Sequence, residues 1–502
     1  MLKLIDRWLN KITMYRLVMY VLALLAAAAM MLAWFGISPA GGLTLAWSLA
    51  LVVGVCYAAN LILAKLWRAP VNPESALISA LIIFFLFSPA TDWTNAVWLA
   101  AAGVLAMLGK YLLAWRGRHI LNPVAAAAVI LSFTNGAAIW WVGNVSLLPL
   151  TLLAAWLIVR KTKRQVLVNA AIVANVLVIS ALAWQTKTGL PEMWWQNFAS
   201  GAIIFLVGVM LTEPLTRPPR HWQQLLYGAV VGAVAGWPFH FGALYSTPEL
   251  ALVLGNLMSY GFSLKSRLVL TLRAKVPVAN NIYEFSFSKP NGCYYQAGQY
   301  LEWTLPHARP DERGSRRYFT IASSPTEDEI KLGVKFNQPS SSFKRTLLKM
   351  EPGAKIYAGS LAGDFVLPRT AAKKLVFIAG GVGITPFRSM LKYLLDKGER
   401  WDIILIYSAR AIADVAYGDI LAAAEQASGL KIVLALNEDG PAAWPKIIGR
   451  LDAQQLRAHI SDYKDRWFYL SGPSGLVDSY QKLLLTLEVP AARVKTDYFP
   501  GF

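Results

Sequence analysis

The sequence has little that could hold a metal or carry sulfur chemistry. Its 502 residues include only two cysteines, Cys56 and Cys293, and five histidines. An iron–sulfur cluster needs about four thiolates, and two cysteines allow at most one disulfide. Iron–sulfur clusters and disulfide-rich scaffolds are therefore excluded, and no metal site is predicted.

Charged residues are also scarce for a chain of this length. They make up 15% of the sequence against 56% hydrophobic residues, and the mean hydropathy is +0.43. This composition is too apolar for an ordinary soluble protein, and the apolar excess lies before about residue 263. We therefore expect a polytopic α-helical membrane domain over 1–263, followed by a globular region large enough for two small domains.

About ten apolar segments in the first region approach the ~20 residues that a helix needs to cross the hydrocarbon core. They lie near 14–35, 43–66, 75–90, 93–114, 120–134, 147–159, 165–184, 199–213, 222–240 and 247–263. Lysine and arginine cluster before the first segment and after every second one, whereas the opposite loops hold almost none. Ten spans with both termini in the cytoplasm satisfy the positive-inside rule, so we expect a multi-pass protein of the cell membrane.

The positive-inside clusters also explain much of the net charge of +19, so nucleic acid is not an expected partner. The first 16 residues are expected to form an amphipathic lead-in at the lipid interface, not a cleaved signal.

Two short segments carry polar residues where a membrane helix would begin or end. "GRHILNPVAAAAV" places Asn122 at the start of one, and "GVMLTEPLTRPPR" places Thr212 and Glu213 at the end of another. Polar groups at membrane depth are usually functional, and proline-interrupted short helices in both halves indicate two repeats with a site between them. Two plainer alternatives stay open: Asn122 is an ordinary helix cap, and Glu213 lies at the headgroups.

On these segments the N-terminal half, residues 15–262, resembles the flavin-bearing membrane subunit of the sodium-pumping NADH:quinone oxidoreductase and its Rnf-complex relative. The resemblance implies about ten helices in two repeats and a flavin held in the membrane by residues such as Asn122, Thr212 and Glu213. That family attaches FMN to the threonine of Ser-Gly-Ala-Thr, whereas here Ile203 follows Ser200-Gly201-Ala202. Any FMN or riboflavin in this domain is therefore expected to be non-covalent.

After Arg267 the pattern changes to alternating strands. "YYQAGQYLEW" carries Gln299 and Tyr300, and "RRYFTIASSP" carries a cation, two aromatics and hydroxyls close together. Arg317 can pair with a diphosphate, Phe319 or Tyr318 can stack on a flat ring, and Thr320 can bond a ring nitrogen. Ser341 and Ser342 then stand at a helix start, where an anion is favoured.

A second domain opens with "KKLVFIAGGVGITPFRSMLKYLL", a buried strand followed by a glycine turn and a helix. Gly381 and Gly383 would let backbone amides approach a pyrophosphate, with Thr385 and Pro386 at the helix start. Three further strand segments alternate with helices, which predicts an α/β domain with a parallel sheet and a ligand at the strand ends.

Together these motifs resemble the ferredoxin–NADP reductase superfamily over 267–502. The resemblance implies an antiparallel β-barrel FAD domain at 264–371 and an NAD(P)-binding α/β domain at 372–502. The flavin signature falls on Arg317, Phe319 and Thr320, and the nucleotide glycine motif on Gly381, Gly383 and Pro386. Residues near the reacting rings would be Thr320, with Ser471, Gly472 and Pro473 in place of the family's Cys-Gly-Pro, and Phe499 or Phe502 covering the flavin.

The expected function is a membrane-bound, FAD-dependent NAD(P)H oxidoreductase that passes electrons to a membrane flavin, a quinone or a far-side acceptor. NADH is preferred over NADPH, because "LNEDG" offers acids although Arg410 could meet a 2′-phosphate. Two alternatives remain: a haem-based ferric reductase or NADPH oxidase, disfavoured by scarce histidines, and a transporter or sensor regulated by its reductase half.

Overall fold

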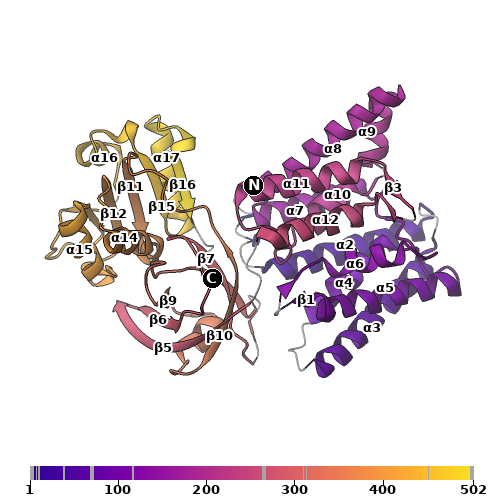
Figure 1. Cartoon of the computed structure of the whole chain (residues 1–502), viewed down its shortest axis with the longest axis horizontal. Coiled ribbons are helices and arrows are strands. Elements are labelled where there is room, and N and C mark those ends of the chain that lie inside the picture. The colour runs from indigo at the N-terminus through magenta and orange to yellow at the C-terminus, as the bar shows by residue number, and fades with distance from the viewer. Residues whose placement is uncertain are drawn as a thin grey trace. The chain divides into compact units, whose positions relative to one another are not determined.

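The computed structural model describes residues 5–6, 8–9, 12–37, 40–67, 73–115, 118–199, 201–242, 244–262, 267–308, 310–311, 314–449 and 451–497. The chain divides into two compact units, Met1–Ser266 and Arg267–Phe502. The first unit is mainly helical and the second contains the two larger sheets (Figure 1).

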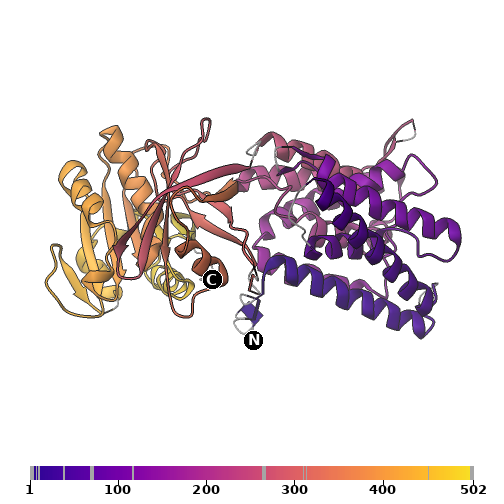
Figure 2. The same cartoon turned by 90° about the horizontal axis from the view of Figure 1, so that it is seen from below.

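The described residues of the first unit are helical apart from two small hairpins, and the helices lie side by side in a bundle (Figure 2). The helices are α2 (Met14–Trp34), α3 (Gly42–Leu66), α4 (Pro73–Leu86), α5 (Trp93–Leu112), α6 (Pro123–Leu131), α7 (Leu148–Thr162), α8 (Gln165–Thr186), α9 (Leu190–Ala199), α10 (Ile203–Phe205), the π-helical η1 (Leu206–Met210), α11 (His221–Gly236) and α12 (Pro248–Phe262). The hairpins pair β1 (Ala114–Trp115) with β2 (Arg118–His119) and β3 (His240–Phe241) with β4 (Leu244–Tyr245). Each apolar segment predicted from the sequence coincides with a helix or with the α10–η1 pair.

Within the described residues, four helices, α2, α3, α5 and α8, are long and apolar enough to cross a membrane. A fifth span results if α9 and the α10–η1 segment, which meet at 55°, form one bent span. Other helices are shorter: α6 has 9 residues, so it is about 14 Å long, under half of the ~30 Å hydrocarbon core. The ten-span topology therefore stays a prediction.

The interior of this unit is built from the short segments. All of η1 is buried, as is most of α4 and of α6. Asn122 caps α6 by accepting hydrogen bonds from the amides of Val124 and Ala125, with proline in the first turn. A short helix that is apolar on all sides belongs in the core of a bundle.

The packing order is the same in two successive groups of segments. In the first group α2 packs on α4, α3 on α5, and α5 on α6; in the second, α7 packs on η1, α8 on α11, and α11 on α12. The first members, α2 and α7, contact each other, as do the last members, α6 and α12. This order is consistent with two repeats that meet at their short helices.

The second unit opens with a six-stranded antiparallel sheet. Its strands are β5 (Leu268–Ala279), β6 (Ile282–Ser288), β7 (Tyr300–Thr304), β8 (Arg316–Thr320), β9 (Glu329–Lys335) and β10 (Lys355–Ala362), in the order β8-β7-β10-β5-β6-β9. The edge strands β8 and β9 approach each other, and Phe285, Phe287 and Trp303 fill the interior. Helix α13 (Ser342–Leu348) lies between β9 and β10 in the chain.

A six-stranded parallel sheet follows, as predicted, with helices on both faces. Its strands are β11 (Leu375–Gly380), β12 (Ile403–Ala409), β13 (Lys431–Leu436), β14 (Lys446–Ile448), β15 (Trp467–Ser471) and β16 (Val494–Asp497), in the order β14-β13-β12-β11-β15-β16. Helices α14 (Thr385–Lys397) and α15 (Gly418–Ser428) pack on one face, and α16 (Ala453–His459) and α17 (Ser474–Thr486) on the other. The strand order reverses between β11 and β15, and the loops after such a switch point form ligand sites in α/β sheets.

Candidate functional site

Strand β8 carries the predicted flavin motif, and its side chains alternate between the two faces of the sheet. The Arg317 guanidinium lies 5.3 Å from the Phe343 ring, and the Phe319 ring is 5.9 Å from the same ring. Tyr318 points the other way and donates a hydrogen bond to Glu302 at 2.7 Å. Of the two aromatic candidates for ring stacking, Phe319 is the one grouped with Arg317.

Arg317 lies beside a carboxylate. Its Nη2 is 3.6 Å from Asp311 Oδ1, and the Ser342 amide donates to Asp311 Oδ2 at 2.8 Å. Donors that hold a carboxylate in this way are also the donors that a diphosphate needs, so this donor set fits FAD. Ser341 instead caps the N-terminus of α13, because its hydroxyl accepts a hydrogen bond from the Lys344 amide at 3.3 Å.

Gln299 and Tyr300 support the turn before β7. Gln299 accepts a hydrogen bond from the Gln296 amide at 2.8 Å and donates to the Gly363 carbonyl at 3.3 Å. The Tyr300 ring meets the Tyr318 ring edge-on at 5.8 Å. The Gln299 amide is therefore engaged with backbone, and Tyr300 lies on the Thr320 face of the sheet, where the two residues pair in register.

The glycine loop after β11 needs its two glycines for different reasons. Gly381 has φ +53° with open space around it, so the backbone angle requires glycine. A Cβ on Gly383 would lie 2.4 Å from the Ser471 carbonyl oxygen and 2.6 Å from Gly472 Cα. Sequence reasoning assigned both glycines to pyrophosphate approach; for Gly383 the structure shows that contact with the loop after β15 imposes the requirement.

The remaining motif residues frame this meeting of loops. Thr385 begins α14 and donates to the Val382 carbonyl at 3.1 Å, with Pro386 in the first turn. Pro473 directly precedes α17. Both loops thus lead into a helix at the switch point of the sheet, the geometry expected of a dinucleotide site.

Asp497 links the flavin motif to the nucleotide motif. Ser471, at the end of β15, pairs in register with Asp497 of β16, and the Thr320 side chain hydrogen-bonds the Asp497 carboxyl group. Burial raises the pKa of Asp497 to about 7, against the lowering effect of that hydrogen bond. Thr320 therefore contacts the residue that pairs in register with Ser471, so the two residues predicted to lie near the reacting rings are linked through Asp497 of β16.

Sequence reasoning missed Asp497. The available signal was an acid directly before the aromatic tail "YFPGF". Phe499, predicted to cover the flavin, lies outside the residues that the structure describes.

Arg410, the candidate cation for a 2′-phosphate, is paired with an acid. Its Nε lies 2.6 Å from Glu438 Oε1, and both side chains are largely exposed. The amides of Asn437 and Glu438 also donate to the Arg410 carbonyl. The loops after β12 and β13 are thus joined at the place where the ribose of the dinucleotide is expected to bind.

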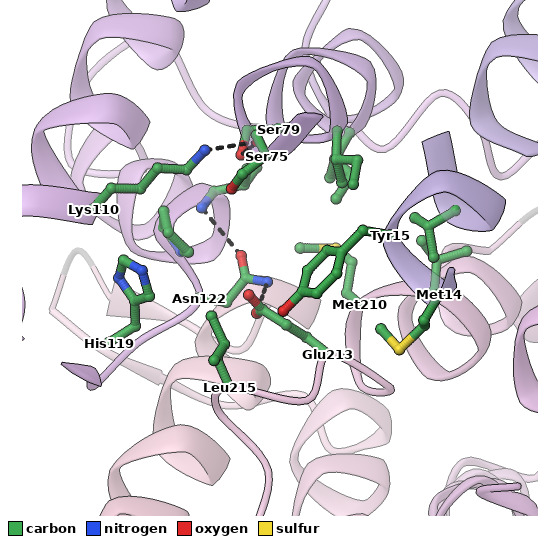
Figure 3. A pocket seen from close by; sticks show the side chains of 16 residues that line it. Met14, Tyr15, Ser75, Ser79, Lys110, His119, Asn122, Met210, Glu213 and Leu215 are labelled. Carbon is green, nitrogen blue, oxygen red and sulfur yellow. Dashed lines mark hydrogen bonds between the residues drawn. The ribbon is translucent and has the colours of Figure 1, made fainter. Parts of the chain in front are cut away.

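The helical unit contains a partly open cavity lined by residues that include Lys110, His119, Asn122 and Glu213. Asn122 Nδ2 donates to Glu213 Oε2 at 2.7 Å, and Lys110 donates to the Ser75 carbonyl at 2.7 Å. Figure 3 shows Asn122 and Glu213 close together, with Lys110 approaching from another side.

The cavity is backed by further polar contacts. The backbone amide of Asn122 donates a hydrogen bond to Asn256 Oδ1 at 2.7 Å, and Asn256 Nδ2 donates to the Tyr227 hydroxyl at 2.8 Å. Asn122 is therefore both the expected helix cap and a partner of Glu213. The third predicted residue, Thr212, donates to the Gly208 and Val209 carbonyls of its own helix instead.

Comparison with known proteins finds relatives for the reductase features. Residues 377–482 match the family described as "Oxidoreductase NAD-binding domain". The chain is 27% identical over 230 residues to the stachydrine N-demethylase reductase subunit of Rhizobium meliloti, covering 45% of this chain and 64% of that protein. It is 29% identical over 205 residues to an NADPH oxidoreductase of Mycobacterium tuberculosis, covering 39% and 51%.

Among solved structures, the FAD/NAD-binding domain of a Vibrio cholerae nitric oxide dioxygenase aligns with a TM-score of 0.41 at 21% identity, covering 46% of this chain and 98% of that one. The chain matches about half to two thirds of the length of the two relatives found by sequence, from Rhizobium meliloti and Mycobacterium tuberculosis. The sequence matches confirm the prediction of an NAD(P)H-dependent flavin oxidoreductase module similar to ferredoxin reductases.

Proposed function

We propose that this protein is a membrane-bound, FAD-dependent oxidoreductase that takes electrons from cytoplasmic NAD(P)H and delivers them into or across the cell membrane. The proposal includes ten spans with both termini in the cytoplasm. The acceptor is a quinone, a flavin bound non-covalently in the helical unit, or an oxidant on the far side. The resemblance of the helical unit to the flavin-bearing subunit of the sodium-pumping oxidoreductase and the Rnf complex is part of this proposal.

One observation carries the reductase part: the Thr320 side chain of the flavin motif hydrogen-bonds Asp497, which pairs in register with Ser471 of the nucleotide motif. Arg317 and the Ser342 amide would hold the diphosphate of FAD, and Phe319 would lie against its ring system. The loops after β11 and β15 would hold the dinucleotide. When bound, FAD supplies the conversion from a two-electron hydride donor to one-electron acceptors.

The polar cavity supports an exit through the helical unit. Lys110, Asn122 and Glu213 lie among apolar walls such as Ile78, Ile82 and Met210. Polar groups inside an apolar bundle are costly and usually functional. Hydrogen-bond donors and a carboxylate beside apolar walls match the chemistry of a quinone head group or a flavin ring.

The full-length protein in detergent tests this proposal. Flavins are extracted and counted per chain, and the remaining sample is mixed anaerobically with NADH or NADPH while flavin absorbance is followed. We expect FAD in every chain and its rapid bleaching, with a second flavin if the helical unit binds one. Absence of FAD, or a sharp Soret band from haem, would contradict the proposal.

We also propose that NADH is preferred, because Glu438 neutralises Arg410 where a 2′-phosphate would bind. Glu438→Ala is expected to raise kcat/KM for NADPH relative to NADH about tenfold, which corresponds to ~1.4 kcal/mol. Asp439→Ala, which removes the neighbouring acid that pairs with Lys446, is the control and should leave the ratio unchanged. An unchanged ratio in Glu438→Ala would refute this assignment.

A further inference from the structure

An ion pair connects the nucleotide helix to the flavin domain. Arg388, on the first turn of α14, is 3% exposed. Its Nη2 donates to Glu327 Oε1 at 2.9 Å, and its Nη1 contacts Glu327 Oε2 and donates to the Ala322 carbonyl at 3.1 Å. The guanidinium therefore binds both a carboxylate and a carbonyl of the segment that follows β8.

Neighbouring contacts join the same two segments. Ser389 Oγ donates to the Ser323 carbonyl at 2.6 Å, and Thr326 Oγ1 donates to Asp396 at the other end of α14. The Tyr295 hydroxyl in turn donates to the Ser324 carbonyl at 2.8 Å. Helix α14 is thus fixed to residues 322–327 along much of its length.

Further charged and aromatic groups surround the ion pair. Lys331 Nζ lies 3.2 Å from Glu284 and 3.8 Å from Glu327, and Arg388 lies 5.7 Å from the Tyr417 ring. A buried ion pair adds little net stability compared with apolar packing, but its hydrogen bonds accept only one geometry. Such a network is suited to fixing the position of two segments.

Both ends of this connection adjoin the reacting groups. Arg388 follows Gly383 by one helical turn and a half, and Ala322 follows Thr320 by two residues. The glycine loop and the flavin motif are therefore connected by a short path of hydrogen bonds and one ion pair.

We propose that Arg388 and Glu327 are positioning residues that set the distance between the nicotinamide and the flavin during hydride transfer. The inference rests on the proposed reductase function. Neither side chain needs to touch a reacting atom, because each acts through the segment that it holds. A displacement of about 1 Å between reacting groups can lower a rate about a hundredfold.

The test uses full-length protein in detergent, loaded with FAD. Stopped-flow absorbance gives the rate of flavin reduction at saturating NADH, and NADH deuterated at the transferred position gives the kinetic isotope effect. Arg388→Met and Glu327→Gln should lower the rate roughly 10- to 100-fold and change the isotope effect, with FAD still bound. Arg388→Lys should restore part of the rate.

Lys464→Met is the matched control, because it removes an exposed ion pair with Glu488 in the same unit. It should leave rate and isotope effect unchanged. If Arg388→Met and Glu327→Gln only lower the unfolding temperature, and reduce flavin at the original rate and isotope effect, the pair is structural and the inference is wrong. If the unmodified protein itself fails to reduce FAD with NADH or NADPH, the proposed function is what fails.

Discussion

Asp497 is expected to make the stability of the folded protein depend on pH. Its pKa is raised to about 7 by burial, against about 3.9 for an unfolded aspartate. As pH rises between these values the unfolded chain ionises while the folded chain stays protonated, so unfolding becomes easier. The stabilisation is fully present below about pH 4 and is lost as pH passes 7.

We therefore expect the unfolding temperature of the flavin-free protein, followed by tryptophan fluorescence, to fall by several degrees between pH 5 and 8, since ~1 kcal/mol corresponds to roughly 2–4 °C in a unit of this size. Asp497→Asn should remove most of that fall. An equal pH dependence in both proteins would show that Asp497 is not the group responsible.

The two glycines of the nucleotide loop predict different outcomes on substitution. Gly383→Ala places a Cβ 2.4 Å from the Ser471 carbonyl oxygen, so the loops must separate, and NADH-dependent flavin reduction should fall at least tenfold while FAD stays bound. Gly381→Ala meets open space and incurs only the strain of a positive φ, about 1 kcal/mol. Equal effects on flavin reduction would contradict the role given to the contact between the loops.

Arg317 should matter for FAD, and its neighbour Arg316 should not. Arg317→Ala removes a charge-assisted contact of about 1.5–3 kcal/mol, so FAD affinity should weaken roughly 10- to 100-fold. Arg316 is its matched control, because it lies on the opposite face of β8 and pairs with Glu302 at 3.5 Å. Flavin content after gel filtration distinguishes the two, and full FAD occupancy in Arg317→Ala would exclude the assigned site.

At the scale of elements, the short helices of the first unit define the cavity. Glu213→Ala removes the partner of Asn122 Nδ2 and should slow electron delivery to a quinone analogue at least tenfold, with NADH-dependent flavin reduction unchanged. Thr212→Val is the control, since Thr212 bonds only its own helix in the described contacts. Loss of electron delivery in Thr212→Val, but not in Glu213→Ala, would show that electrons do not leave through the Glu213 cavity.

Helices and strands could be predicted from the sequence where their signals lie in neighbouring residues. Apolar runs located the helices, and Asn122-Pro123 marked the start of α6 through capping chemistry. The glycine turn before Thr385 and the alternation around Arg317 located the strand–loop junctions of the reductase unit. Periodicity did not indicate that η1, which packs against α7, is π-helical.

Contacts between residues far apart in the chain were not predictable. Asp311 meets Ser342 from 31 residues away, and Arg388 meets Glu327 from 61 residues away. Asp497 joins Thr320 because β16 is added at the far edge of the parallel sheet. Such pairings depend on how strands are ordered, and one sequence carries no direct record of that order.

At the scale of the whole molecule, a reductase unit and an apolar helical unit share one chain. A single helix would suffice to anchor a reductase to a membrane, and four helices in the described part of the chain are long and apolar enough to cross one. The helical unit also contains the cavity around Asn122 and Glu213. We infer that this unit takes part in electron transfer.

The most direct test reconstitutes the full-length protein in liposomes that contain a membrane quinone or enclose an impermeant oxidant. NADH is added outside, and its oxidation is followed together with reduction of the acceptor. The account predicts acceptor reduction that is fast in the unmodified protein and at least tenfold slower in Glu213→Ala, with equal flavin reduction in both. Equal and slow acceptor reduction in the two proteins, despite rapid flavin reduction, would contradict it.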